Sequence, residues 1–178
     1  TGSTGLNKGN NRHSLAATWH DFDLDGDPDL YVANDYGANQ LFRNDPAEEG
    51  KRVFTEIAAM VGVEDKGAGM SASWGDFNRD GRPDLYVGNM YSNAGSRITS
   101  QPEFPMANNA GLLAVYRRFA KGNTLFSQVK PTRFIENEDT ATMGRWAWSS
   151  LFADLNNDGW QDLFVANGYI TATHPEDL

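Results

Sequence analysis

Three copies of one nine-residue acidic phrase constrain this chain more than any other feature. Each copy has acidic or amide side chains at positions 1, 3, 5 and 9 and glycine at position 6, and the copies occupy residues 21–29, 76–84 and 154–162. So many carboxylates in a short loop repel one another. Ca²⁺ relieves that repulsion because it accepts about six to eight oxygen ligands in a flexible geometry. The glycine permits the sharp turn that brings positions 1, 3 and 5 around one point.

The flanks of the loops exclude an EF-hand, which needs a bidentate glutamate at position 12, carried on a helix. Position 12 is valine in each copy: Val32, Val87 and Val165. The segments after the loops are short, apolar and β-prone, namely residues 30–34, 85–89 and 163–167. The segments before the loops place large residues six and two positions ahead of the first aspartate, which is a strand period. Each loop is therefore predicted to join two adjacent strands.

The repeating unit is larger than the loop. Two further strands are predicted downstream of each of the first two copies, at residues 39–44 and 53–57 and at residues 123–126 and 133–136. The repeats span approximately residues 14–63, 68–137 and 145–171, with an insertion at approximately residues 90–122 of the second. About four short strands per unit at this spacing are typical of a β-propeller blade. We therefore expect an all-β chain of about three four-stranded blades, with calcium-binding inter-strand loops and one short helical insertion.

These residues carry a family resemblance over nearly the whole chain. The loops resemble the FG-GAP (also VCBS) repeats of integrin-α-type propellers. More narrowly, residues 74–89, 39–44 and 144–148 are similar to repeats of bacterial secreted proteins with an ASPIC/UnbV region, which are cartilage acidic protein-like. The resemblance implies a seven-bladed or similar propeller that holds Ca²⁺ in some of its loops. It also implies adhesion or recognition more than a shared reaction.

The family pattern also implies the ligands of three Ca²⁺ sites. Side chains at positions 1, 3, 5 and 9 bind the metal, together with the backbone carbonyl at position 7. Carried over, the implied ligands are Asp21, Asp23, Asp25, Asp27 and Asp29; Asp76, Asn78, Asp80, Arg82 and Asp84; and Asp154, Asn156, Asp158, Trp160 and Asp162. Arg82 and Trp160 can ligate only through the main chain, as position 7 requires.

The number of repeats in this chain is smaller than the number of blades in a closed propeller. Propellers typically close with about four to eight blades, whereas about three repeats are present here. We therefore expect that this chain is part of a larger propeller, or that it completes its ring with other chains. Self-association through open blade edges is expected in the second case.

The amino-acid composition excludes some classes of partner and of binding site. The net charge of −9 argues against a nucleic-acid partner, which would need basic patches. The ten loop aspartates whose side chains are assigned as ligands account for much of this acidity, and three bound Ca²⁺ would leave a charge of −3. No apolar run approaches the ~20 residues that span a bilayer. Cysteine is absent, which excludes disulfides and zinc–thiolate sites but not secretion, so the expected location is extracellular, cell-surface or periplasmic.

Features outside the loops leave alternatives open. Residues 110–121 have helical spacing, and this helix could bind a partner or pack across the propeller face. Trp146 and Trp148 could stack on a sugar, but Trp148 aligns with Leu15 and Met70, which favours a core position. His13, His20 and His174 share no spacing, and we expect no catalytic or cofactor-binding residue.

Two function classes follow. The preferred one is a calcium-binding module of a secreted or surface protein, which recognises a protein or glycan or acts as a scaffold, and is not an enzyme. The alternative is a fragment of a propeller polysaccharide lyase or hydrolase. A lyase would need a base beside a charge-neutralising cation, and the sequence shows no such constellation. Oligosaccharide cleavage would distinguish the two classes.

Overall fold

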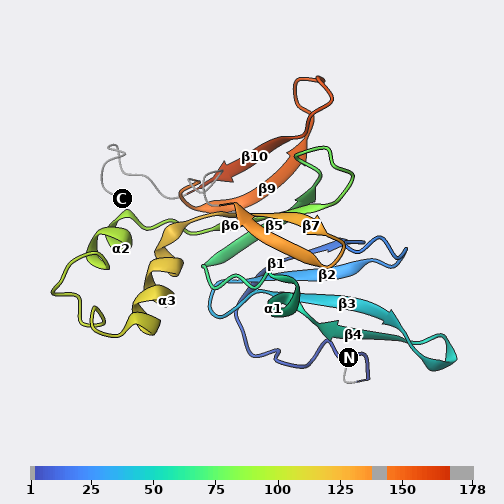
Figure 1. Cartoon of the computed structure of the whole chain (residues 1–178), viewed down its shortest axis with the longest axis horizontal. Coiled ribbons are helices and arrows are strands. Elements are labelled where there is room, and N and C mark those ends of the chain that lie inside the picture. Colours follow the sequence, from blue (N-terminus) through green and yellow to red (C-terminus); the bar gives the residue numbers. More distant parts are fainter. Residues whose placement is uncertain (1–2, 138–143, 169–178) are drawn as a thin grey trace.

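The computed structural model describes residues 3–137 and 144–168, and this part of the chain is mostly β. It forms three antiparallel sheets of four, four and two strands, which lie side by side (Figure 1). The prediction of a mainly β chain is confirmed, and a strand is present at each segment where the sequence predicts one. Among the described residues, no helix is long and apolar enough to cross a membrane.

The first sheet has the order β1-β2-β3-β4, so that each strand pairs with the next along the chain. Its strands are β1 (Ser14–His20), β2 (Asp29–Asn34), β3 (Gln40–Pro46) and β4 (Arg52–Glu56). A 3₁₀ turn (Glu48–Gly50) precedes β4, and the short helix α1 (Ala58–Val61) follows it. Gly62 ends α1 in the left-handed region at φ 94°, where glycine carries no steric penalty.

The second sheet repeats this order as β5-β6-β7-β8, and the third pairs two strands. The strands are β5 (Gly69–Gly75), β6 (Asp84–Asn89), β7 (Thr124–Lys130), β8 (Arg133–Asn137), β9 (Ala147–Ala153) and β10 (Asp162–Asn167). Between β6 and β7 the chain leaves the sheet and forms α2 (Asn93–Ile98) and α3 (Ala110–Lys121).

Helix α3 is present where the sequence predicts a helix, but only part of it packs on the sheets. The side chain of Asn109 caps its N-terminus by accepting from the Leu112 N–H at 3.1 Å. Near its C-terminal end, Phe119 stacks on Tyr36 with the ring centroids 5.7 Å apart. The apolar side chains of its outer face, Leu112, Val115 and Tyr116, remain about half exposed. The outer face of α3 is therefore not buried against the sheets.

The first two strands of each sheet pair in the same register. His20 lies opposite Asp29, Gly75 opposite Asp84, and Ala153 opposite Asp162. At the far end of each pair the register shifts, which leaves one residue unpaired: Leu15, Met70 and Trp148. The expectation that Trp148 is a core residue is wrong, because its side chain at this bulge is 51% exposed.

The hydrophobic core lies between neighbouring sheets. The first strand of each sheet contacts the first strand of the next, β1 with β5 and β5 with β9. One cluster, which includes Tyr31 and Phe134, fills the space between the first two sheets, and a smaller one with Tyr86 and Phe152 lies between the second and third. The equivalent residue of the third sheet, Phe164, is half exposed. Burial therefore follows the presence of a neighbouring sheet.

Candidate metal centres

The three acidic loops lie on one side of the molecule, away from α2 and α3 (Figure 1). Each loop connects the first and second strands of its sheet. Because the strands pair in the same register, the loops start from equivalent points. We describe them by loop position, counting the first aspartate as position 1.

The first loop gathers three carboxylates. Oxygen atoms of Asp21, Asp23 and Asp29 all lie within 4.8 Å of one another. The carboxylate of Asp21 accepts from the backbone N–H groups at positions 5 and 6, at 3.0 and 2.9 Å, which holds the turn. Asp29 accepts from the N–H at position 2 at 3.2 Å. The remaining predicted side chain, Asp25, is not in this group and accepts from the N–H at position 7 at 2.9 Å.

The second and third loops repeat these contacts. Asp76 and Asp154 accept from the N–H groups at positions 5 and 6 at 2.8–3.0 Å. Asn78 and Asn156 at position 3 accept from the N–H at position 5, at 3.0 Å in both loops. The position 5 carboxylates, Asp80 and Asp158, accept from the N–H at position 7 at 3.0 and 2.8 Å. At position 9, Asp84 accepts from the N–H of Gln128, and Asp162 from the N–H at position 2.

Two residues of each loop adopt left-handed backbone conformations. The glycine at position 6 has φ between 79° and 94°: Gly26, Gly81 and Gly159. Position 4 is also left-handed although it is not glycine: Leu24, Arg79 and Asn157, with φ of 58–61°. The sequence analysis missed position 4, because leucine and arginine give no signal for this conformation and only asparagine is enriched in it. The loop therefore carries local strain, which the hydrogen bonds to position 1 offset.

Buried oxygens in these loops fit a bound cation. Among the described residues, Asp23 Oδ1 and Asp84 Oδ2 are buried and have no hydrogen-bond partner. Burial raises the pKa of Asp29 to about 6 and the pKa of Asp84 to about 6. Burial also raises the pKa of Asp23, and the charges of Asp25 and Asp21 add to the rise. A cation bound in the first loop beside Asp23 and Asp29, and another in the second loop beside Asp84, would supply the positive charge that these carboxylates lack.

The side chains at position 7 make other contacts. Asp27 pairs with Arg52. Arg82 pairs with the Asp80 carboxylate and donates to the Gln128 carbonyl at 2.8 Å. Trp160 lies under the guanidinium of Arg79, 5.0 Å from the ring centroid. None of these three side chains joins the groups at positions 1, 3 and 9, which is compatible with the implied use of the backbone carbonyl at position 7.

Comparison with known proteins agrees with the loop geometry. A family model described as an FG-GAP-like repeat matches residues 21–87, a span that includes the first two loops and the strands between them. Residues 21–87 are thus similar to an FG-GAP-like repeat. This confirms the resemblance seen in the sequence.

Proteins similar to this chain include cartilage acidic protein 1 from three vertebrates. The Homo sapiens protein is 26% identical over 79% of this chain and 26% of its own length. The Mus musculus protein is 39% identical over 34% of this chain and 9% of its own length, and the Xenopus tropicalis protein is 39% identical over the same shares. The chain thus spans about a quarter or less of the length of the relatives that it matches.

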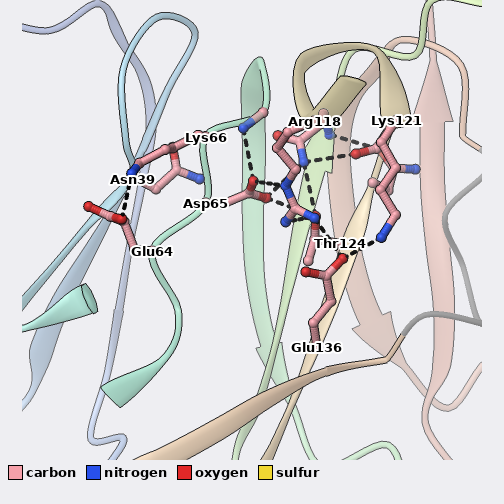
Figure 2. Close-up of polar contacts among 12 residues, drawn as sticks. Asn39, Glu64, Asp65, Lys66, Arg118, Lys121, Thr124 and Glu136 are labelled. Carbon is pink, nitrogen blue, oxygen red and sulfur yellow. Dashed lines mark hydrogen bonds and ion pairs between the residues drawn. The ribbon is translucent and has the colours of Figure 1, made fainter. Parts of the chain in front are cut away.

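A second cluster of polar side chains was not predicted from the sequence. Asp65 is fully buried between the first two sheets. Its carboxylate accepts hydrogen bonds from Arg118 Nε and from the Thr124 hydroxyl, both at 2.8 Å. Arg118 also donates to Glu136 at 2.6 Å, as does Lys121 at 2.6 Å (Figure 2). These residues are up to 71 positions apart and share no motif. Only the fold brings them together.

Proposed function

We propose that this chain is a calcium-binding β-propeller module of an extracellular protein, which recognises a protein or glycan partner. The observation that carries the proposal is the repeated loop, in which the carboxylates at positions 1 and 5 accept the same backbone hydrogen bonds in three copies and acidic or amide oxygens stand at equivalent positions. The buried oxygens of Asp23 and Asp84 that lack donors support a cation as the missing partner. The oxygen-only ligand set favours a hard cation.

In this proposal each loop holds one Ca²⁺. The first would use Asp21, Asp23, Asp25 and Asp29, with the carbonyl of Asp27. The other two would use Asp76, Asn78, Asp80, Asp84 and the carbonyl of Arg82, and Asp154, Asn156, Asp158, Asp162 and the carbonyl of Trp160. A bound ion would tie together the ends of two strands. Mg²⁺ fits less well because it demands tighter octahedral geometry and gives up its water reluctantly.

The proposed propeller is supported by the way the sheets follow one another. The first strands of the three sheets are neighbours, and each four-stranded sheet runs in simple sequence order, as propeller blades do. The face of each sheet that bears Tyr31 or Tyr86 is covered by the next sheet, whereas Phe164 at the equivalent place is half exposed. We propose that further blades cover this face, from the same protein or from another chain.

The proposed extracellular, cell-surface or periplasmic location is supported by the likeness to FG-GAP-like repeats and to cartilage acidic protein 1. We propose binding rather than catalysis, because the acidic side chains recur at the same loop positions in all three repeats, as expected for metal ligands. Incubation of the calcium-loaded chain with acidic and neutral oligosaccharides tests this directly. Chain cleavage or formation of an unsaturated product would overturn the proposed non-enzymatic role.

Calcium titration by isothermal calorimetry tests the proposal itself. We expect three sites, of which the first loop fills first, because it offers four acidic ligands where each of the others offers three and an asparagine. The pairing of Asp80 with Arg82 also opposes filling of the second loop. Asp25→Ala should remove the tightest phase, whereas Asp80→Ala and Asp158→Ala should remove weaker ones. Calcium binding that survives all three substitutions unchanged would disprove the assigned loops.

A further inference from the structure

The insertion between β6 and β7 forms a cavity that the calcium loops do not use. The cavity has a volume of about 720 Å³ and lies between α2 and α3. Its floor includes the small or aliphatic side chains Ala110, Leu113 and Ala114, which lie on one face of α3. The volume is in the range of small-molecule sites, about 300–1,000 Å³.

Among the described residues, the polar lining of this cavity is basic or hydroxylic. Arg117, Arg118 and Lys121 lie on the same face of α3 as the aliphatic floor, and none of the lining residues in the described part of the chain is aspartate or glutamate. The insertion as a whole, residues 90–122, carries four basic residues and one acidic residue, although the chain has a net charge of −9. Positive charge is therefore concentrated in this segment.

The three basic residues differ in how they are held. Arg118 is fixed by Asp65 and Glu136, and Lys121 is fixed by the same glutamate (Figure 2). Arg117 is exposed and makes one long hydrogen bond, to the Thr99 carbonyl at 3.4 Å. Its remaining N–H groups are directed to no protein acceptor in the described part of the chain. Arg117 is thus the side chain with donors available for a ligand, beside two cations that are held in place.

The hydroxyl groups on the opposite wall of the cavity can accept hydrogen bonds, whereas Arg117 can only donate them. Ser96, Thr99 and Ser100 each donate their hydroxyl proton to a helix carbonyl, at 3.4, 3.2 and 2.7 Å. Their oxygen atoms retain lone pairs, and the residues line the cavity. These oxygens can therefore accept hydrogen bonds from O–H groups of a ligand. The cavity offers donors to an anion on one wall and acceptors to hydroxyls on the other.

We propose that this cavity binds an acidic sugar unit of an oligosaccharide, with the carboxylate on Arg117 and the sugar hydroxyls on Ser96, Thr99 and Ser100. A guanidinium matches the two oxygens of a carboxylate. An inorganic anion would leave the acceptor wall without donors and would fill little of the volume. The inference specifies the glycan partner of the proposed recognition function but does not depend on calcium being the bound metal.

Titration of the calcium-saturated chain with two tetrasaccharides of equal length tests this site. One is built from alternating glucuronate and N-acetylglucosamine, and the other is neutral cellotetraose. We expect one glucuronate tetrasaccharide per chain and at least tenfold weaker binding of cellotetraose. Arg117→Gln should weaken the acidic ligand at least tenfold, and Ser100→Ala should weaken it about threefold. Arg97→Gln, an exposed arginine of α2 outside the cavity, is the matched control and should change it less than twofold.

Three outcomes would overturn the proposal: no binding of the glucuronate tetrasaccharide, equal effects of Arg117→Gln and Arg97→Gln, or sodium sulfate binding as tightly as the tetrasaccharide. Calcium titration of the same samples separates this failure from failure of the calcium proposal. A chain that binds calcium but no acidic sugar refutes the cavity alone. Melting curves of the variants verify that they remain folded.

Discussion

The two ends of the sheets differ in how much the repeats have diverged. At the end that carries the acidic loops, the three units share one strand register and the same backbone hydrogen bonds to the carboxylates at positions 1 and 5. At the opposite end, the first unit joins its second and third strands through residues 35–39, whereas the second joins them through residues 90–123, which include two helices. Both units nevertheless keep one contact there. The N–H of Asn34 donates to Asn39 at 2.7 Å, and that of Asn89 to Asn123 at 2.8 Å. This hydrogen bond between the two asparagines holds the ends of the second and third strands together, so that the connection between them can vary in length without a change in the sheet.

The two ends also differ in how their buried carboxylates are neutralised. At the loop end, Asp29 and Asp84 receive hydrogen bonds from backbone N–H groups, and neither forms an ion pair with a basic side chain of the described residues. Near the insertion, Asp65 is paired with Arg118 and Glu136 with Arg118 and Lys121. The insertion end thus carries its own cations, whereas the proposed Ca²⁺ ions would supply the positive charge at the loop end.

Calcium removal should have the largest effect and should act at the loop end. An ion that binds only the folded state adds RT ln(1 + [L]/Kd), about 2.7 kcal/mol per site at a hundredfold excess over Kd. Three sites would add about 8 kcal/mol, which is comparable with the stability of a typical domain. We expect EDTA to lower the melting temperature by roughly 20 °C and to promote aggregation. Scanning calorimetry measures the shift.

The control for this experiment is excess Mg²⁺, which should restore little of the lost stability. Hydrogen exchange locates the change, which we expect at residues 21–29, 76–84 and 154–162 before it reaches α3. A melting curve that is unchanged in EDTA, with metal removal verified by elemental analysis, would contradict the dependence of the loop end on calcium.

Removal of the Asp65–Arg118 ion pair at the insertion end should lower the free energy of unfolding by less than calcium removal does. It should leave calcium binding unchanged. Arg118→Met removes the partner of the fully buried Asp65, and an unpaired buried charge costs about 3–5 kcal/mol. We expect the free energy of unfolding to fall by about 3 kcal/mol in saturating calcium, because Arg118 is itself partly exposed. Denaturant unfolding measures this loss. Arg117→Met, the exposed neighbour, should change stability by less than about 0.5 kcal/mol.

Calcium titration of both variants completes the comparison. We expect the same number of sites and the same affinities as in the unmodified chain, since α3 lies away from the loops (Figure 1). Equal destabilisation by the two substitutions would show that the Asp65 pair does not secure the insertion. Lost calcium binding in Arg118→Met would show that the two ends are coupled.

The sequence predicted the loop end far better than the insertion end. The loops depend on residues at fixed short spacings, and their strands follow from local apolar patterns, so Asp21 to Asp29 could be interpreted without any tertiary contact. The cluster of Asp65, Arg118 and Glu136 depends on contacts between distant segments, which no local pattern records. Trp148 shows the same limit. Its spacing predicted a buried strand position like that of Met70, but Met70 is buried in the middle sheet, whereas Trp148 lies in the last described sheet and is exposed.

The smallest expected effect is the pH dependence of the insertion end. Burial raises the pKa of Glu136, but hydrogen bonds from Lys121 and Arg118 and their charges outweigh this, so that its pKa lies below the ordinary value of 4.5. A carboxyl with a lowered folded-state pKa stabilises the fold above its ordinary pKa. It loses this contribution as the pH falls through the lowered pKa.

We expect Glu136→Gln to lower the free energy of unfolding by about 1–2 kcal/mol at pH 7. The difference from the unmodified chain should shrink as the pH falls through the lowered pKa of Glu136, because this side chain then becomes neutral like the glutamine that replaces it. Measuring this difference, rather than absolute stability, cancels the titration of the loop carboxylates. A difference that does not shrink at any acidic pH at which the chain stays folded would show that the charge of Glu136 does not stabilise the insertion.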